Sequence, residues 1–190
     1  MTIGVYQYIR KAWLKPGRDM LQSRMIQWRA SEAVTEVEKP LRLDRARALG
    51  YKAKKGFFVV RVRIRRGGRQ RTRHKHGRKS RKQHVMKILK MNYQWVAELR
   101  AAAKYDNLVV LNSYLLAKDG KHGFYEVIMV DPQRPEIQND KTMNWICDPQ
   151  HASRVQRGLT SAGKQSRGLR VKGPNRKVRP SVRAWERMGK

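Results

Sequence analysis

Residues 108–132 have the sequence LVVLNSYLLAKDGKHGFYEVIMVDP, and this stretch decides the fold. It contains two runs of apolar, β-branched and aromatic residues, 108–117 and 124–130. The turn-forming segment KDGKHG (118–123) separates them, and Asp131-Pro132 closes the second run. Two such runs joined by a glycine-containing loop are typical of an antiparallel hairpin. The sequence therefore predicts a β-hairpin over these residues.

A third strand is predicted over residues 57–66, FFVVRVRIRR. Side chains of a strand point alternately to its two faces, and the residue types alternate here from Phe58 onward. The apolar face is made by Phe58, Val60, Val62 and Ile64, and the opposite face by Arg61, Arg63 and Arg65. We therefore expect a strand that is buried on one side.

Helices are predicted on both sides of this strand in the sequence. Apolar residues spaced three and four apart between 85 and 104 indicate a helix ending near Lys104. They are Val85, Ile88, Leu89, Trp95, Val96, Leu99, Ala102 and Ala103. The amino-terminal region predicts two short helices broken at Pro16-Gly17, the second with Leu21, Met25 and Trp28 facing inward, and a third short helix before Gly50. The expected fold class is α+β: a small, mostly antiparallel sheet covered on one face by the 85–104 helix.

Charge divides the 190-residue chain into blocks. The net charge of +31 comes from +5 in residues 1–51, +17 in 52–90, −2 in 91–150 and +11 in 151–190. A highly charged block cannot bury enough apolar surface to fold alone, so the packed core belongs to the near-neutral segment. We therefore expect amino-terminal helices (1–51), an α+β core (52–150) carrying a basic loop (65–84), and a basic, irregular tail (151–190) that is ordered mainly by a partner.

An excess of positive charge on this scale requires an abundant anionic partner. No apolar run approaches the roughly 18–20 residues of a membrane-spanning helix, and the amino terminus lacks the apolar stretch of a secretory signal. We therefore expect no membrane partner. The single cysteine, Cys147, cannot form an intrachain disulfide and fits a reducing, cytosolic setting. Nucleic acid is the expected partner.

The basic blocks indicate phosphate binding. Alternate arginines on a strand are about 6.6 Å apart, and their planar guanidinium groups can bind phosphate oxygens in pairs. The run RRGGRQRTRHKHGRKSRK (65–82) has ten Lys and Arg among eighteen residues and no acid. Both its ends are fixed by predicted core elements, which favours insertion into a folded nucleic acid over a free tail. Motifs for reading a DNA sequence are absent, so structured RNA is favoured over a specific DNA site.

Signals of catalysis or metal binding are weak. Gly158–Lys164 matches GxxxxGK of a phosphate-binding loop, but Gln165 stands where the motif needs Ser or Thr, and no apolar strand precedes it. The five histidines and Cys147 lack the spacing of a zinc site. We therefore expect no catalytic residue, no metal site and no cofactor.

Three stretches together resemble the large-subunit ribosomal protein L-fifteen-e family of archaea and eukaryotes. They are RALGYKAKKGFFVVRVRIRRGGRQR (47–71), residues 108–132, and RGLTSAGKQSRGL (157–169), the last being specific to the family. The resemblance implies a non-enzymatic structural constituent of the large ribosomal subunit, in the cytoplasm, with an α+β core and basic extensions. Short length and basic bias suggest the archaeal form.

The expected partners are large-subunit rRNA and neighbouring large-subunit ribosomal proteins, with no homo-oligomer. The resemblance and the basic pattern together give these RNA-binding candidates: Arg61, Arg63, Arg65, Arg66, Arg69, Arg71, Arg73, Lys75, Arg78, Lys79, Arg81, Lys82, Lys164, Arg167, Arg170, Lys172, Arg176 and Lys177. The similarity becomes loose after about Arg170. Two alternatives stay open: an RNA-processing enzyme that uses the Gly158–Lys164 loop, and a DNA-compacting architectural protein.

Overall fold

The computed structural model describes residues 4–70, 76–77, 86–87, 89 and 91–170. Its main sheet has four antiparallel strands in the order β1-β2-β6-β5, which are β1 (Val34–Val37), β2 (Phe57–Arg65), β6 (His122–Val130) and β5 (Val109–Lys118). The predicted hairpin is confirmed as β5 and β6, and the predicted strand as β2. The fold is α+β, as expected.

The central strand β6 is enclosed on both faces of the sheet. Every residue from Gly123 to Val130 is buried, and Phe124, Val127 and Ile128 are fully so. Continuous apolar runs of this kind are typical of strands covered on both sides. The expectation of a sheet covered on one face was therefore incomplete, because the run FYEVIMV offers apolar side chains to both layers.

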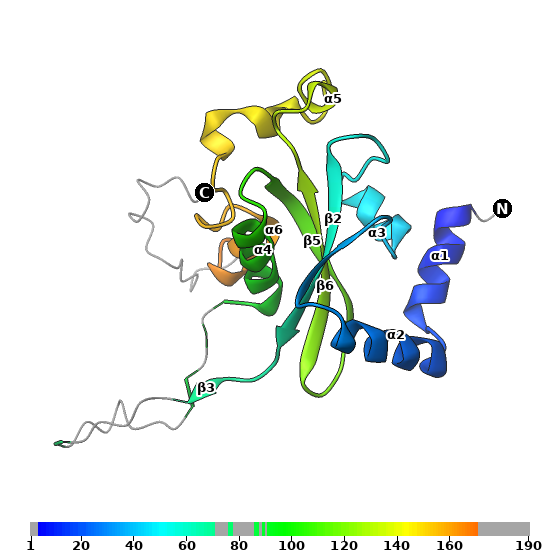
Figure 1. Cartoon of the computed structure of the whole chain (residues 1–190), viewed down its shortest axis with the longest axis vertical. Helices are drawn as coiled ribbons and strands as arrows, with labels where there is room; N and C mark the ends of the chain where they lie inside the picture. The colour runs from blue at the N-terminus through cyan, green and yellow to red at the C-terminus, as the bar shows by residue number, and fades with distance from the viewer. Residues whose placement is uncertain (1–3, 71–75, 78–85, 88, 90, 171–190) are drawn as a thin grey trace.

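On one face lie α4 (Tyr93–Lys104) and the short α6 (Ser161–Ser166), which are side by side in Figure 1. They cover the apolar face predicted for β2, since Val60, Val62 and Ile64 are buried against Ala97 and Ala101. The alternation from Phe58 therefore identified the inward side of this strand.

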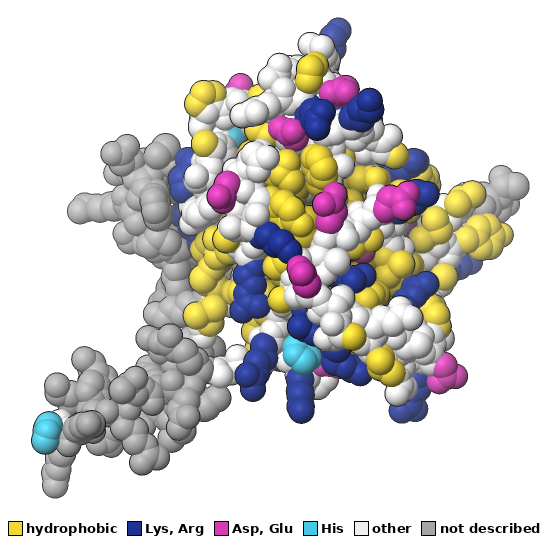
Figure 2. Space-filling view, viewed as in Figure 1, with side chains coloured by type: hydrophobic (Ala, Val, Ile, Leu, Met, Phe, Trp, Pro, Cys, Tyr) yellow, Lys and Arg dark blue, Asp and Glu magenta, His cyan; other side chains and the backbone are white. Residues whose placement is uncertain are grey.

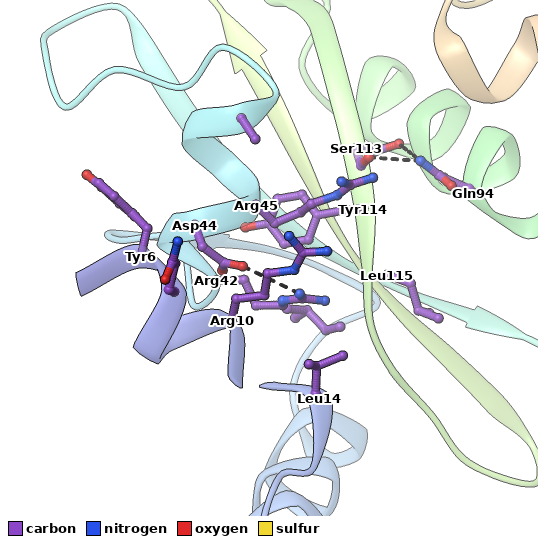
Figure 3. A pocket seen from close by; sticks show the side chains of 13 residues that line it. Tyr6, Arg10, Leu14, Arg42, Asp44, Arg45, Gln94, Ser113, Tyr114 and Leu115 are labelled. Carbon is purple, nitrogen blue, oxygen red and sulfur yellow. Dashed lines mark hydrogen bonds and ion pairs between the residues drawn. The ribbon is translucent and has the colours of Figure 1, made fainter. Parts of the chain in front are cut away.

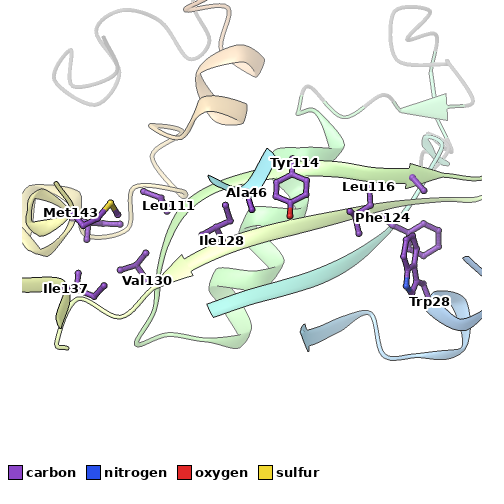
Figure 4. Close-up of a cluster of buried hydrophobic side chains, with 12 residues drawn as sticks. Trp28, Ala46, Leu111, Tyr114, Leu116, Phe124, Ile128, Val130, Ile137 and Met143 are labelled. Atoms are coloured by element: carbon purple, nitrogen blue, oxygen red, sulfur yellow. The ribbon is translucent and has the colours of Figure 1, made fainter. Parts of the chain in front are cut away.

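The opposite face is covered by the amino-terminal helices α1 (Val5–Leu14), α2 (Arg18–Ala30) and α3 (Leu43–Ala48), and by α5 (Pro135–Gln138) beyond the end of β6. Trp28 packs on Phe124 with ring centroids 5.3 Å apart. Figure 4 shows this cluster running from Trp28 to Met143. The break at Pro16-Gly17 and the inward positions of Leu21, Met25 and Trp28 are confirmed.

The helix predicted from residue 85 begins later. Helix α4 starts at Tyr93, where the Asn92 side chain accepts a hydrogen bond from the Trp95 N–H at 2.7 Å and so caps the first turn. Met86 and Lys87 instead form β4, which pairs with β3 (Arg69–Gln70) at the base of the basic loop. Leu89, which the helical spacing included, is 61% exposed, and Val85 and Ile88 lie outside the described residues.

Two further differences concern segments with few apolar residues. Residues 34–37, for which no strand was predicted, form the edge strand β1 by pairing with β2. The expectation of an extended or irregular chain from 151 is wrong for 161–166, which form α6. Within the part of the expected tail that is described, residues 151–170, Val155, Thr160 and Ala162 are buried. Residues 171–190, the rest of the expected tail, lie outside the described residues.

Two buried glutamates connect the layers. Glu98 on α4 accepts hydrogen bonds from the hydroxyls of Ser113 on β5 and Thr160 before α6, the latter at 2.5 Å. On the other face, Glu126 accepts from the Tyr114 hydroxyl and, at 3.2 Å, from the Leu41 N–H. Burial raises the pKa of both carboxyl groups, although these hydrogen bonds act in the opposite direction.

We predict that Glu98→Gln is at least as stable as the wild type at neutral pH. The raised pKa means that the folded wild type binds a proton more tightly than the unfolded chain, so its stability falls as pH rises from the ordinary Glu value toward the folded value. The side-chain amide of the Glu98→Gln variant does not titrate, so it adds no such pH dependence to the stability. The stability advantage of Glu98→Gln in urea unfolding should therefore shrink as pH is lowered through the raised pKa of Glu98, and an advantage that grew on acidification would contradict this assignment.

Glu98→Ala supplies the matched control. It removes the acceptor of two hydroxyls and leaves a cavity, so it should lower the free energy of unfolding by at least about 2 kcal/mol at every pH.

Candidate nucleic-acid interface

The arginine face of β2 is partly covered by α2. Arg61 is half-buried, and its guanidinium lies 5.4 Å from the centroid of the Trp28 ring. It is also paired in register with Glu126 on β6. Burial lowers the pKa of Arg61, and the nearby Glu126 opposes that shift. Arg61, the first of the three β2 arginines predicted to bind phosphate, is therefore packed against other parts of the protein.

The next arginines along β2 become progressively more accessible. Arg63 is partly exposed and donates to the Arg29 carbonyl at the end of α2. Arg65 is exposed at the end of the strand, opposite His122. Arg66 is exposed too, and donates to the Asp119 carbonyl in the β5–β6 turn. The arginine row thus leads from the core to this end of the sheet.

Basic side chains gather at this end of the sheet, as the lower part of Figure 2 shows. We call this surface the basic rim and define it by the following residues: Arg29, Arg63, Arg65, Arg66, Lys118 and Lys121. Its geometry is fixed by Asp119, which bonds Arg29 at 2.9 Å and the Lys121 N–H at 2.7 Å. Burial alone would raise the pKa of Asp119, but the His122 N–H, Arg29 and the Lys121 N–H lower it to about 2.

The basic rim continues into the basic loop. Strands β3 and β4 pair Arg69 with Lys87 and Gln70 with Met86, so the two ends of the loop leave the protein side by side. The Gly67 N–H donates to the Tyr93 hydroxyl at 2.8 Å, which ties the start of the loop to α4. The base of the basic loop is therefore held at one fixed place beside the sheet.

The segment that resembles a phosphate-binding loop has a packing role. Thr160 caps α6 by accepting from the Gly163 N–H at 3.2 Å, and its own hydroxyl donates to Glu98. A Cβ on Gly163 would lie 2.7 Å from the Gly158 Cα, and Gly158 has a φ of +66°. These glycines are needed for close backbone contact and a left-handed turn.

Arg167 completes the same unit. It is buried and donates to the carbonyls of Arg157 and Gly158 at 3.2 and 3.3 Å, and burial lowers its pKa. The Trp95 indole N–H donates to the Val155 carbonyl at 2.8 Å. Residues 155–167 are therefore fastened to α4 by polar contacts.

Comparison with known proteins identifies the family. The model of the ribosomal protein L15e family, described as Ribosomal L15, matches residues 4–185. The chain belongs to the L15e family. It is 46% identical over 196 residues to "Large ribosomal subunit protein eL15" of Methanocella arvoryzae, covering 100% of both chains. It is 49% identical over 190 residues to the protein of the same name from Methanospirillum hungatei, covering 97% of both. Both relatives are archaeal, as expected.

Membership of the L15e family makes the chain a ribosomal protein and not an enzyme. No group of His, Cys, Asp and Glu among the described residues has the arrangement of a metal site. Within the same part of the chain, no helix is long and apolar enough to cross a membrane.

The RNA-binding candidates fall into four groups. Exposed or partly exposed are Arg63, Arg65, Arg66, Lys164 and Arg170, whereas Arg61 and Arg167 are largely engaged inside the protein. Arg69 lies in β3. Outside the described residues lie Arg71, Arg73, Lys75, Arg78, Lys79, Arg81, Lys82, Lys172, Arg176 and Lys177.

Sequence reasoning missed three members of the basic rim: Arg29, Lys118 and Lys121. Lys118 and Lys121 belong to the near-neutral block, so block charge did not point to them. Their position in the hairpin turn, next to the end of β2, was the available signal.

We predict that Gly163→Ala destabilises the fold by about 1–3 kcal/mol, because the added methyl group meets the Gly158 backbone. Urea unfolding would measure the loss. Gln165→Ala, at an exposed position of the same helix, should change stability little. ATP binding by the wild type that is lost in Lys164→Ala would contradict a packing role and favour nucleotide chemistry.

Proposed function

We propose that this protein is a structural constituent of the large ribosomal subunit that binds and stabilises folded rRNA by neutralising phosphate charge during translation. It would act in the cytoplasm, inside the subunit and beside neighbouring large-subunit proteins. The observation that carries the proposal is the basic rim continuing into the anchored basic loop. Family membership and two relatives named as large-subunit proteins support the same conclusion.

In the proposed mechanism, the protein core holds the binding surface in place, and the basic residues outside the core contact the RNA. The near-neutral core fixes the end of the sheet through buried carboxylates and apolar packing. The basic rim then meets phosphates at the surface of the RNA, and the basic loop enters a crevice between RNA helices. Close approach of two RNA helices is opposed by phosphate repulsion, and a rigidly held row of guanidinium and ammonium groups offsets it.

The remaining candidate residues have graded roles in this proposal. Arg65 and Arg66, with the basic residues of the loop, bind phosphate directly. Arg61 and Arg167 hold the protein surface in shape, because their guanidinium groups already face an aromatic ring or backbone carbonyls. Lys164 of α6 and Arg170, which follows that helix in the sequence, contact RNA at a separate place.

We predict a steep salt dependence of binding between the purified full-length protein and transcribed large-subunit rRNA. Each phosphate contact releases counterions, so the slope of log affinity against log salt should be about −0.7 to −0.9 per contact. Replacing seven loop residues by Gln should reduce the slope by about 5 to 6. They are Arg71, Arg73, Lys75, Arg78, Lys79, Arg81 and Lys82.

The control replaces Arg134 and Lys141 by Gln, since both are exposed in a region that also carries acids. That pair should leave the slope nearly unchanged. A flat slope for the wild type would contradict phosphate neutralisation. Cofractionation tests the assignment independently: the protein should remain stoichiometric with large subunits after a high-salt wash, whereas association with chromatin would favour the DNA-compacting alternative.

A further inference from the structure

A cavity of about 740 Å³ lies between α1, α3 and β5, away from the basic rim. Its base is formed by buried residues of β5, among them Tyr114 and Leu116. Gln94 of α4 borders it from beyond the edge of the sheet and is held by hydrogen bonds of 2.8 and 3.0 Å to the carbonyl and hydroxyl of Ser113. A volume of this size is in the usual range for small-molecule and cofactor sites.

The helical wall of the cavity is held in place by two cation–π contacts. The Arg47 guanidinium of α3 lies 5.5 Å from the centroid of the Tyr6 ring of α1, and it also donates to the Tyr6 hydroxyl. Arg42 lies 5.3 Å from the ring centroid of Trp13, near the other end of α1. Helix α1 is therefore docked on α3, although none of its described residues is fully buried.

The charge of the cavity is strongly unbalanced. Arg10, Arg42 and Arg45 all line it, and Figure 3 shows their guanidinium groups gathered between α1 and β5. The only acid in the lining is Asp44, whose carboxylate lies 3.7 Å from the Arg42 guanidinium. Arg10 and Arg45 are exposed, and their guanidinium groups have no hydrogen-bond or ion-pair partner among the described residues. Like charges brought together without compensation oppose folding, so an anion at this place would stabilise the protein.

Apolar side chains border the same opening. Leu14 of α1 is 72% exposed and Leu115 of β5 is 39% exposed, and both line the cavity. An arginine cluster beside exposed apolar surface suits a ligand that has an anionic group and a flat apolar part. A nucleotide has both, because its phosphate binds guanidinium groups and its base packs on apolar or aromatic side chains.

We propose that this cavity binds an unpaired nucleotide of an RNA strand, with its phosphate held by Arg10 and Arg45 and its base against Leu14 and Leu115. This rests on the proposed function, and it adds a contact site outside the basic rim and the basic loop. Arg42 contributes positive charge from a more buried position, where Asp44 and Trp13 hold it.

A second cavity favours an RNA strand over an acidic protein segment. It has a volume of about 650 Å³, shares Gln94 and Leu115 with the first, and reaches Gly67 and Gly68 at the start of the basic loop. Glycine leaves the backbone open to close approach. A single strand that crosses the edge of β5 at Leu115 would therefore pass from the arginine cavity to the basic loop.

The test compares two double variants of the full-length protein that remove the same charge: Arg10→Gln/Arg45→Gln and Lys11→Gln/Arg18→Gln. Lys11 and Arg18 are exposed, on α1 and α2, and do not line the cavity. The probe is transcribed large-subunit rRNA of Methanospirillum hungatei, titrated at several salt concentrations. The cavity pair should weaken binding roughly tenfold or more and reduce the salt slope by about 0.7 to 0.9, the value for one phosphate, whereas the control pair should weaken binding by no more than about threefold.

Equal effects of the two pairs would overturn the proposal, because they would reflect net charge alone. Unchanged RNA affinity of the cavity pair would also overturn it, while a steep wild-type slope would leave the proposed function standing. Binding of poly-L-glutamate that the cavity pair loses while it keeps full RNA affinity would assign the cavity to an acidic protein segment instead.

Arginine footprinting of the wild type makes the test independent of variant folding. Phenylglyoxal modification should fall at Arg10 and Arg45 when the rRNA is bound, with Arg18 as the reference position. Protection of Arg10 and Arg45 no greater than that of Arg18 would overturn the proposal.

Discussion

The fold depends on a few acidic side chains whose oxygens accept hydrogen bonds from separate parts of a chain with 45 Lys and Arg against 14 Asp and Glu. Each of them joins segments that are far apart in sequence. Glu98 links α4 to β5 and to the turn before α6, and Glu126 links β6 to Leu41 beyond β1. Asp140 binds Lys52 at 2.7 Å and Lys54 at 2.5 Å, and these lysines hold its pKa well below the ordinary range. Because the acids are used in this way, the positive charge inside the folded unit is locally compensated.

The same use of acids leaves the outer basic residues uncompensated. Asp119 lies in the turn at this end of the sheet, and its carboxylate is occupied by Arg29 and by backbone N–H groups. Arg65, Lys118 and Lys121 therefore face solvent without an acidic partner among the described residues. In the cavity beside α1, the one acidic lining residue, Asp44, is paired with Arg42, so Arg10 and Arg45 have no acidic partner among the described residues. Among the described residues, unpaired positive charge thus gathers at these two surfaces, and an RNA phosphate would relieve the electrostatic repulsion at both.

Much of the fold could be predicted from local sequence patterns. The elements that depend on contacts between residues far apart in the sequence could not. The alternation of β2, the hairpin of β5 and β6, and the break at Pro16-Gly17 are each encoded within a few residues. The start of α4 at Tyr93 depends on a cap by Asn92, whose side chain also donates to the Ala162 carbonyl, 70 residues away. The folding of 155–167 likewise depends on Glu98 and Trp95, so composition alone made this segment resemble a disordered tail. The same holds for the candidate site. The basic loop could be predicted from its charge, but the cavity arginines could not, because they come together only when α1 docks on α3.

The position of Arg61 explains why an arginine row can be both structural and functional. A guanidinium group is planar and weakly hydrated, so it can lie on the Trp28 ring and still keep N–H groups for other partners. Along β2 the environment changes from the Trp28 contact at Arg61, through a backbone carbonyl at Arg63, to solvent at Arg65. Lysine would suit the first of these positions less well, because its ammonium group is strongly hydrated and cannot lie flat on a ring. The alternation Arg-Val-Arg-Ile-Arg therefore satisfies two requirements with one residue type: it anchors α2 at one end of the strand and presents free cations at the other.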